Sequence, residues 1–240
     1  MATIKGVFFD LGGTLRILHQ DPAHQAIARA RMAELAGMED VNGLMDLINL
    51  RYEDYRVWAL GENKEAGDYD LWAKWLLPEL PEEQLRAICH EMTYQYRQVK
   101  GIRYLVDGGL EVIQTLHQKG YKLGIISNLI GENEIPDWLR ADNLEQYFDA
   151  VILSSVCHIR KPDPEIYHLA CQELGVTPAE CVSVADNLNR DITGAKAAGI
   201  GANILYISPE KLAKKTITDE NRPDYIVHRF TDILTLPILA

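Results

Sequence analysis

Short apolar runs alternate with helical periodicities in the second half of the chain, beyond about residue 101. An apolar run that ends at a turn or a polar residue is typical of a buried strand, whereas apolar residues at i, i+3 and i+4 favour a helix. Strands are predicted at 7–9, 122–127, 150–153, 181–185, 202–207 and 225–227, and helices at 109–119, 164–174 and 191–198. This alternation predicts a three-layer α/β fold built on a parallel sheet.

Residues 20–100 show a different pattern, which is helical almost throughout. Between residues 41 and 60, for example, Leu44, Leu47, Ile48 and Tyr52 fall on a single helical stripe. Four helices are predicted here, at 24–36, 41–60, 70–77 and 82–99. Because the breaks between them are short and carry no strand signal, this region is predicted to be an inserted helical bundle.

The overall composition is that of a globular protein, with 47% hydrophobic and 25% charged residues in a chain of 240. The formal net charge of −11 argues against a nucleic-acid surface, which needs a basic patch. No apolar stretch reaches membrane-spanning length and no cleavable signal is recognisable, so no membrane association is expected. The four cysteines lack metal-ligand spacing, which favours free thiols in the cytoplasm: Cys89, Cys157, Cys171 and Cys181.

The stretch from Val7 to Leu15 places a carboxylate, Asp10, directly after a buried strand and before two glycines. Ligands of open α/β sheets bind beyond the carboxyl ends of the strands, so Asp10 is a candidate nucleophile or metal ligand. Considered alone, the residue is equally well explained as the cap of a turn.

Other polar residues follow later strands in the same way. Ser127 and Asn128 end one strand, Asp186 ends another, and Lys161 and Asp191 lie close to helix starts. In a parallel sheet all of these positions share one edge. Carboxylates, a hydroxyl and a lysine together suit a hard cation such as Mg²⁺ and a phosphoryl group.

The order of these motifs resembles the haloacid dehalogenase (HAD) superfamily. The chain carries Asp-x-x-Gly-Thr-Leu from Asp10, Ser-Asn at 127–128, Lys-Pro-Asp-Pro-Glu from Lys161 and Asp-x₄-Asp from Asp186. The helical insertion resembles the C1 cap of the phosphoglycolate-phosphatase-like branch. The resemblance implies a Rossmann-like core formed by residues 1–16 and 101–240 and a cap formed by residues 17–100.

The same resemblance implies roles for individual residues. Asp10 attacks phosphorus and forms an aspartyl-phosphate, and Lys161 neutralises the charge on the nucleophile and the transferred group. Ser127, Asn128 and Thr14 are predicted to bind the substrate. The implied Mg²⁺ ligands are Asp10, the backbone carbonyl of Gly12, Asp186 and Asp191.

Gly12 is the main departure from the family pattern, because phosphatases of this family usually carry a second aspartate two residues after the nucleophile. That aspartate protonates the leaving oxygen and later activates water, and losing a positioned acid/base costs on the order of 10²–10⁴-fold in rate. Smaller departures are Ala185, where a glycine often precedes the metal aspartate, and Arg16 after the first motif.

Three outcomes follow from this departure. Water or a nearby side chain (Arg16, His19 or His24) replaces the missing acid, and a Mg²⁺-dependent phosphatase of reduced or leaving-group-limited activity results. Alternatively the reaction is that of a phosphonatase, which needs a cap lysine such as Lys64 or Lys74, or of a dehalogenase, which the later aspartates disfavour. In the third outcome the protein is a non-catalytic phosphate-binding or interaction module.

The first outcome is the prediction, with a small phosphorylated metabolite as substrate, and the sequence indicates neither which metabolite nor the oligomeric state. Substrate choice is expected to belong to the cap. Its aromatic and basic side chains are candidates for lining an entrance, although their helical spacing favours core packing for most of them: Tyr52, Tyr55, Arg56, Trp58, Trp72 and Trp75.

Overall fold

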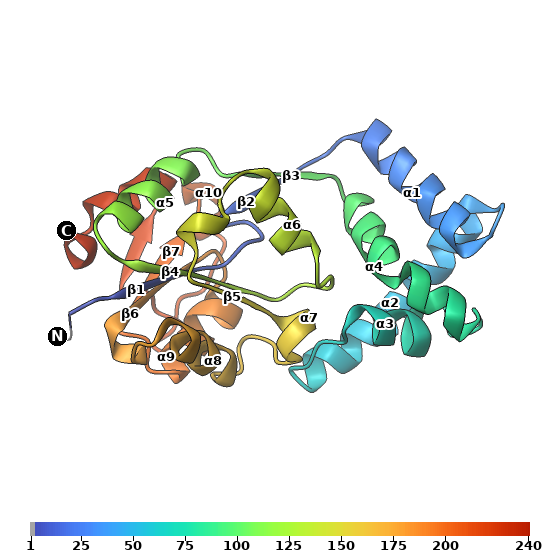
Figure 1. The fold of residues 1–240 in the computed structure, drawn as a ribbon. Helices are drawn as coiled ribbons and strands as arrows, with labels where there is room; N and C mark the ends of the chain where they lie inside the picture. Colours follow the sequence, from blue (N-terminus) through green and yellow to red (C-terminus); the bar gives the residue numbers. More distant parts are fainter. Residues whose placement is uncertain (1–2) are drawn as a thin grey trace.

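A six-stranded parallel sheet forms the centre of the protein, in the order β5-β4-β1-β6-β7-β8 (Figure 1). The computed structural model describes residues 3–240. The strands are β1 (Gly6–Phe9), β4 (Lys122–Ser127), β5 (Ala150–Leu153), β6 (Cys181–Ala185), β7 (Ala202–Tyr206) and β8 (Tyr225–Val227). All six strand predictions and the predicted Rossmann-like α/β fold class are confirmed.

Strand β1 lies near the middle of the sheet because its four residues are all apolar or glycine and are all buried. Phe9 is paired with Ile125 of β4 on one side and with Val184 of β6 on the other. This register brings the carboxyl ends of three strands to one edge of the sheet. The residues that follow them in the chain therefore start from neighbouring positions.

Helices cover both faces of this sheet (Figure 1). Helices α5 and α6 contribute to the larger apolar cluster on one face, and α8 and α9 contribute to a second cluster on the other. The helices of this part of the chain are α5 (Gly109–Gln118), α6 (Glu134–Ala141), α7 (Ser154–Cys157), α8 (Glu165–Leu174), α9 (Thr193–Ala197) and α10 (Pro209–Leu212). Short 3₁₀ turns are η2 (Glu145–Tyr147), η3 (Pro178–Glu180), η5 (Phe230–Thr235) and η6 (Pro237–Leu239).

The predicted helix at 191–198 has a different start in the structure. A π-helical turn, η4 (Leu188–Ile192), precedes α9, so the helical path begins at Leu188 instead of Asp191. The side chain of Asn187 caps this start by accepting hydrogen bonds from the backbone N–H groups of Asn189 and Arg190. The apolar periodicity alone does not indicate this earlier start, because the start depends on capping by a polar side chain.

The helical insertion packs around an apolar cluster of its own and stands to the right of the sheet in Figure 1. Its elements are α1 (Pro22–Ala36), α2 (Val41–Gly61), α3 (Asp68–Asp70), the π-helical turn η1 (Leu71–Leu76) and α4 (Glu82–Gln98). We refer to these elements as the cap helices. Tyr55 and Trp72 are fully buried in the cluster, as the helical spacing of the aromatic residues predicts.

Two strands that the sequence analysis did not predict connect the sheet to the cap helices. Strand β2 (Arg16–His19) and strand β3 (Ile102–Leu105) pair in antiparallel fashion, beside the predicted cap boundaries at residues 17 and 100. Each strand has only four residues, and its buried and exposed positions do not alternate regularly. Neither strand therefore shows the two-residue periodicity that would predict it. The division into core and cap at those boundaries stays a prediction.

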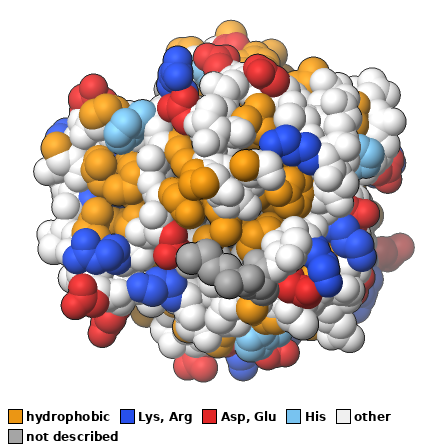
Figure 2. Space-filling view, turned by 90° about the vertical axis from the view of Figure 1, so that its left-hand side faces the viewer, with side chains coloured by type: hydrophobic (Ala, Val, Ile, Leu, Met, Phe, Trp, Pro, Cys, Tyr) orange, Lys and Arg blue, Asp and Glu red, His pale blue; other side chains and the backbone are white. Residues whose placement is uncertain are grey.

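Both chain ends lie at the end of the molecule that faces away from the cap helices (Figure 1). Figure 2 shows that this face carries apolar side chains near its middle, with charged side chains of both signs around them. Within residues 3–240, no helix combines the length and the apolar character that crossing a membrane requires.

Candidate active site

Asp10 and Lys161 meet at the carboxyl edge of the sheet, although 151 positions separate them in the chain. Lys161 Nζ donates to Asp10 Oδ1 at 2.6 Å and to the carbonyl oxygen of Ile126 at 2.8 Å. It also lies 2.5 Å from Asp191 Oδ1. All three charged side chains are at most 4% exposed. A buried ammonium group thus bridges the predicted nucleophile and one predicted metal ligand.

Asp186 completes a group of three carboxylates with Asp10 and Asp191, and one oxygen atom from each lies within 4.8 Å of the others. Asp186 follows β6 and Asp10 follows β1, so the parallel register of the two strands explains why they meet. Three oxygen donors from carboxylates at this spacing fit a Mg²⁺ ion, which takes oxygen ligands and leaves further positions to water and phosphate.

Arg190 also belongs to this site, and the sequence analysis did not identify it. Its guanidinium donates to Asp191 Oδ2 at 2.7 Å and lies 3.5 Å from Asp10 Oδ2 and 3.6 Å from Asp186 Oδ1. Arg190 lies inside the Asp-x₄-Asp motif, but Asp186 precedes the helical turn that starts at Leu188, so no helical spacing pointed to their contact.

The local charges shift the pKa values of the three carboxyl groups in different directions. Burial, opposed by Lys161, raises the pKa of Asp10. Burial and the negative charges of Asp10 and Asp191 raise the pKa of Asp186 to about 6. Burial acts against ionisation of Asp191 too, but Lys161 and Arg190 outweigh it and lower the pKa of that group. Asp191 is therefore the most firmly ionised of the three.

The structure requires glycine at only one of the two glycine positions after Asp10. Gly13 has φ 87°, and a Cβ atom at this position would overlap Asp186 Oδ2, so glycine is required there. Gly12 has no such constraint, because no heavy atom lies within 4 Å of the place a Cβ would occupy. The missing acid/base side chain is thus a property of the sequence and not of the available space.

The remaining predicted site residues lie around Asp10 and Lys161. Asn128 accepts a hydrogen bond from the backbone N–H of Lys161 and donates one to its carbonyl oxygen, each 2.8 Å long, and so positions the lysine. Thr14 Oγ1, fully buried, donates to Asp10 Oδ2 at 3.4 Å. Ser127 ends β4 and lines a cavity together with Gly12. The predicted roles of these residues in binding a substrate or metal stay predictions.

The candidates for replacing the missing acid are placed unequally. Arg16 is buried and donates to Glu134 Oε1 at 2.7 Å. His19 is exposed and packs edge-on against the ring of Tyr104, whereas His24 bonds to Gln98 through Nε2 at 3.2 Å. Only Arg16 lines the same cavity as Gly12.

Neither lysine considered for a phosphonatase reaction lies in the carboxylate group. Lys74 is exposed and forms an ion pair with Asp70, which is four residues earlier in the chain. Lys64 is exposed as well, in a bridge to Ile159. Both residues are therefore placed as surface lysines.

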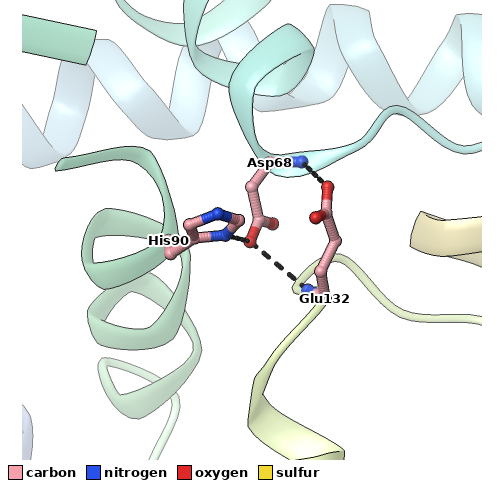
Figure 3. A group of neighbouring side chains, drawn as sticks. All are labelled: Asp68, His90 and Glu132. Carbon is pink, nitrogen blue, oxygen red and sulfur yellow. Dashed lines mark hydrogen bonds and ion pairs between the residues drawn. The ribbon is translucent and has the colours of Figure 1, made fainter. Parts of the chain in front are cut away.

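The cap helices contact the core through a line of polar groups beside the site. Figure 3 shows Asp68 of α3 between His90 of α4 and Glu132 of the segment before α6. Asp68 Oδ2 is 2.7 Å from His90 Nδ1 and accepts from the backbone N–H of Glu132, while Glu132 Oε1 accepts from the backbone N–H of Asp68 at 2.7 Å. These reciprocal bonds fix the seam between cap helices and core.

A family model for haloacid dehalogenase-like hydrolases matches residues 4–199, which is most of the chain. The chain belongs to the haloacid dehalogenase-like hydrolases. The superfamily assignment made from the motifs is thus confirmed, and with it the general function of a hydrolase.

Several relatives of this HAD-like hydrolase have named activities. It is 28% identical to the pyrophosphatase PpaX of Listeria monocytogenes over 156 residues, which cover 64% of this chain and 68% of the relative. It is 26% identical to the N-acylneuraminate-9-phosphatase of Mus musculus over 155 residues, which cover 64% of this chain and 59% of the relative.

Solved structures share the fold over nearly the whole chain. A predicted phosphoglycolate phosphatase from Haemophilus somnus 129PT matches with a TM-score of 0.59 and 21% identity, covering 98% of both chains. A 2-haloacid dehalogenase from Pseudomonas syringae pv. tomato DC3000 matches with a TM-score of 0.66 and 22% identity, covering 97% of both chains. At this level of identity the likeness shows the HAD fold alone.

Proposed function

We propose that this hydrolase is a Mg²⁺-dependent phosphatase of a small phosphorylated metabolite. One observation carries the proposal: Asp10, Asp186 and Asp191 converge at one edge of the sheet, and Lys161 lies 2.6 Å from Asp10. This arrangement offers a nucleophile, a cation site and a fixed positive charge. The phosphatase names of two relatives point to the same reaction class.

Asp10, Asp186 and Asp191 would hold the Mg²⁺ ion, which supplies charge neutralisation for the phosphoryl oxygens when bound. An ionised Asp10 oxygen attacks phosphorus, the bond from phosphorus to the leaving oxygen breaks, and an aspartyl-phosphate forms. Lys161 keeps Asp10 ionised and offsets the charge of the transferred group. Thr14 and Asn128 hold the nucleophile and the lysine in position through the hydrogen bonds described above.

Gly12 offers no side chain to either proton transfer. In the first step the leaving oxygen takes its proton from water, so substrates with good leaving groups are favoured. In the second step water attacks the aspartyl-phosphate without a positioned base, releases phosphate and regenerates Asp10. A loss on the order of 10²–10⁴-fold relative to a complete acid/base is expected.

The test uses p-nitrophenyl phosphate with Mg²⁺ and with EDTA. We expect Mg²⁺-dependent release of p-nitrophenol that Asp10→Asn abolishes, because the amide is no nucleophile. Rapid mixing is expected to show a burst of p-nitrophenol followed by slow turnover, since hydrolysis of the aspartyl-phosphate lacks a base. Activity that survives Asp10→Asn would overturn the proposal.

The open space at Gly12 supports a second candidate function, a phosphate-binding protein without turnover. The same assay separates the two. Binding of phosphate and Mg²⁺ by calorimetry, without any product or trapped phospho-enzyme, would favour the binding protein.

A further inference from the structure

A cavity of about 150 Å³ beside Asp10 is bordered by three arginines, Arg16, Arg97 and Arg103. They come from β2, α4 and β3, so the wall is assembled from the cap side of the molecule. Gly12 and Ser127 form the opposite border of the same cavity. A group held by these arginines therefore lies next to the place where the proposed phosphoryl transfer occurs.

The carboxylates nearby do not balance the charge of this wall. Buried Glu134 pairs with Arg16 at 2.7 Å and also with Arg97. Among residues 3–240, no carboxylate forms an ion pair with Arg103, which donates instead to the carbonyl oxygen of Arg97 at 3.1 Å. Burial and the neighbouring charge of Arg97 lower the pKa of Arg103 to about 10. Glu134 is thus paired with two of the three arginines, and the third, half-buried Arg103, has no carboxylate partner.

Arg16 supplies a second, independent observation. Its residue is 7% exposed, and its guanidinium lies 4.7 Å above the ring of Trp138, which fixes its plane. Its Nε is buried and has no hydrogen-bond partner within the described part of the chain. A buried N–H without an acceptor costs roughly 1–3 kcal/mol, so such donors normally face a ligand or water.

The positive wall continues into an adjoining cavity, also of about 150 Å³, that shares Arg97, Arg103 and Asn128 with the first. Tyr52 and Lys100 border it as well. Lys100 lies 5.5 Å above the ring of Tyr96, and no carboxylate of residues 3–240 pairs with it. The two cavities together give room for more than a single inorganic phosphate.

A larger cavity, of about 730 Å³, has a different character. It carries Lys211, Lys214 and Lys215 next to Asp186, but all three lysines are exposed. Exposed lysines are solvated and need no ligand. The buried arginine wall is thus the better candidate for recognition.

We propose that Arg16, Arg97 and Arg103 form a subsite for a second anionic group, so that the substrate carries a carboxylate or a further phosphate close to its scissile phosphoryl group. This inference rests on the proposed phosphatase function and narrows its substrate class. Arg103 is the specificity-determining residue, because among the three arginines it is the one that forms no ion pair with a carboxylate of residues 3–240. A guanidinium binds either carboxylate or phosphate in bidentate fashion, so the shared chemistry is that of an oxyanion.

The experiment measures binding of non-hydrolysable phosphonates by calorimetry in the presence of Mg²⁺, so it does not depend on turnover. Propylphosphonate and 3-phosphonopropionate form a pair that differs only in the terminal carboxylate, and ethane-1,2-bisphosphonate carries a second phosphonate instead. We expect at least one of the two doubly anionic probes to bind ~10-fold or more tightly than propylphosphonate, the effect of one charge-assisted hydrogen bond. Whichever binds better identifies the second anion.

Arg103→Met is expected to remove this preference, and its circular dichroism spectrum and melting temperature report whether the variant is folded. Arg103→Lys is expected to keep part of the preference. The control is Arg222→Met, because Arg222 is exposed and pairs only with Asp219. Equal affinities of all three probes would overturn the second-anion subsite and leave the phosphatase proposal standing. Binding of none of them would overturn both.

Discussion

Two groups of charged side chains near Gly12 have opposite charge and opposite origin, and we call them the core wall and the cap-side wall. The core wall gathers three carboxylates around Lys161 and Arg190, from the ends of β1 and β6, from η4 and from the segment before α8. The cap-side wall gathers three arginines around Glu134, from segments up to 118 positions away from it. In the core wall acids outnumber bases, whereas in the cap-side wall bases outnumber acids.

The difference separates reaction from recognition. The acidic wall suits the nucleophile and the cation of the proposed reaction. The basic wall suits an anion whose position differs from that of the transferred phosphoryl group. The carboxylates and the arginines therefore form separate groups, and Gly12 lines the same cavity as the arginines.

The largest change is expected from filling position 12. Because a Cβ at Gly12 meets no atom within 4 Å, Gly12→Asp should fit without rearrangement. It supplies the missing acid/base, so kcat is expected to rise by about 10²–10⁴-fold on an alkyl phosphate, whose leaving group is poor. The measurement is steady-state phosphate release, with Gly12→Asn as the isosteric control. A rise in both variants, or in neither, would contradict the assigned role of the position.

Removing the positive centre of the acidic wall comes next. Lys161→Met leaves Asp10 and Asp191 buried without the ammonium group between them. We expect kcat to fall by about 10²–10³-fold, as for loss of one preorganised donor to a developing charge. We also expect a lower melting temperature in EDTA that Mg²⁺ partly restores. Lys196→Met, at an exposed lysine, is the control, and an unchanged kcat in Lys161→Met would count against the mechanism.

The smallest effect concerns the single acid of the basic wall. Glu134→Gln leaves Arg16 and Arg97 without a carboxylate, and the free energy of unfolding is expected to fall by about 2 kcal/mol, the worth of a charge-assisted bond. Urea denaturation at pH 7 measures this change. Phosphatase activity on p-nitrophenyl phosphate is expected to change much less than in Lys161→Met.

Comparing the native protein with Glu134→Gln at different pH values tests the charge of Glu134. Burial opposes ionisation of Glu134, but Arg97 and Arg16 outweigh it and hold its pKa below the usual 4.5. A lowered folded-state pKa stabilises above the unfolded value and loses this contribution as the pH falls through the folded one. The stability gap between the native protein and Glu134→Gln should be complete above pH 4.5 and close below it. A gap independent of pH would show that the charge of Glu134 is irrelevant.

The acidic wall could be predicted from the sequence because most of its parts follow from local rules. Apolar runs end at Asp10 and Asp186, and parallel strands place such ends at one edge. Lys161 was predicted from its motif, but its position depends on two hydrogen bonds exchanged with Asn128, a contact 33 positions away in the chain. Arg190 was not predicted, because Asp186 lies before the helical turn of Leu188–Ile192 and no spacing rule links the two.

The basic wall could not be predicted in the same way. Arg16, Arg97 and Arg103 belong to no shared motif, and each alone has the character of a solvated arginine. They come together only because β2 and β3 pair across the whole helical insertion, between Arg16 and Leu105. Neither strand shows a periodicity of its own, so a pairing over almost ninety positions was invisible in the pattern of apolar residues.

Arg190 has a consequence for the protein before any ion reaches it. The guanidinium is held among all three carboxylates, so a charge of the chain itself offsets part of their mutual repulsion. Binding of the proposed Mg²⁺ would exchange this tethered charge for a diffusible one. We expect the affinity for the ion to be set as much by how readily this side chain swings aside as by the oxygen donors themselves.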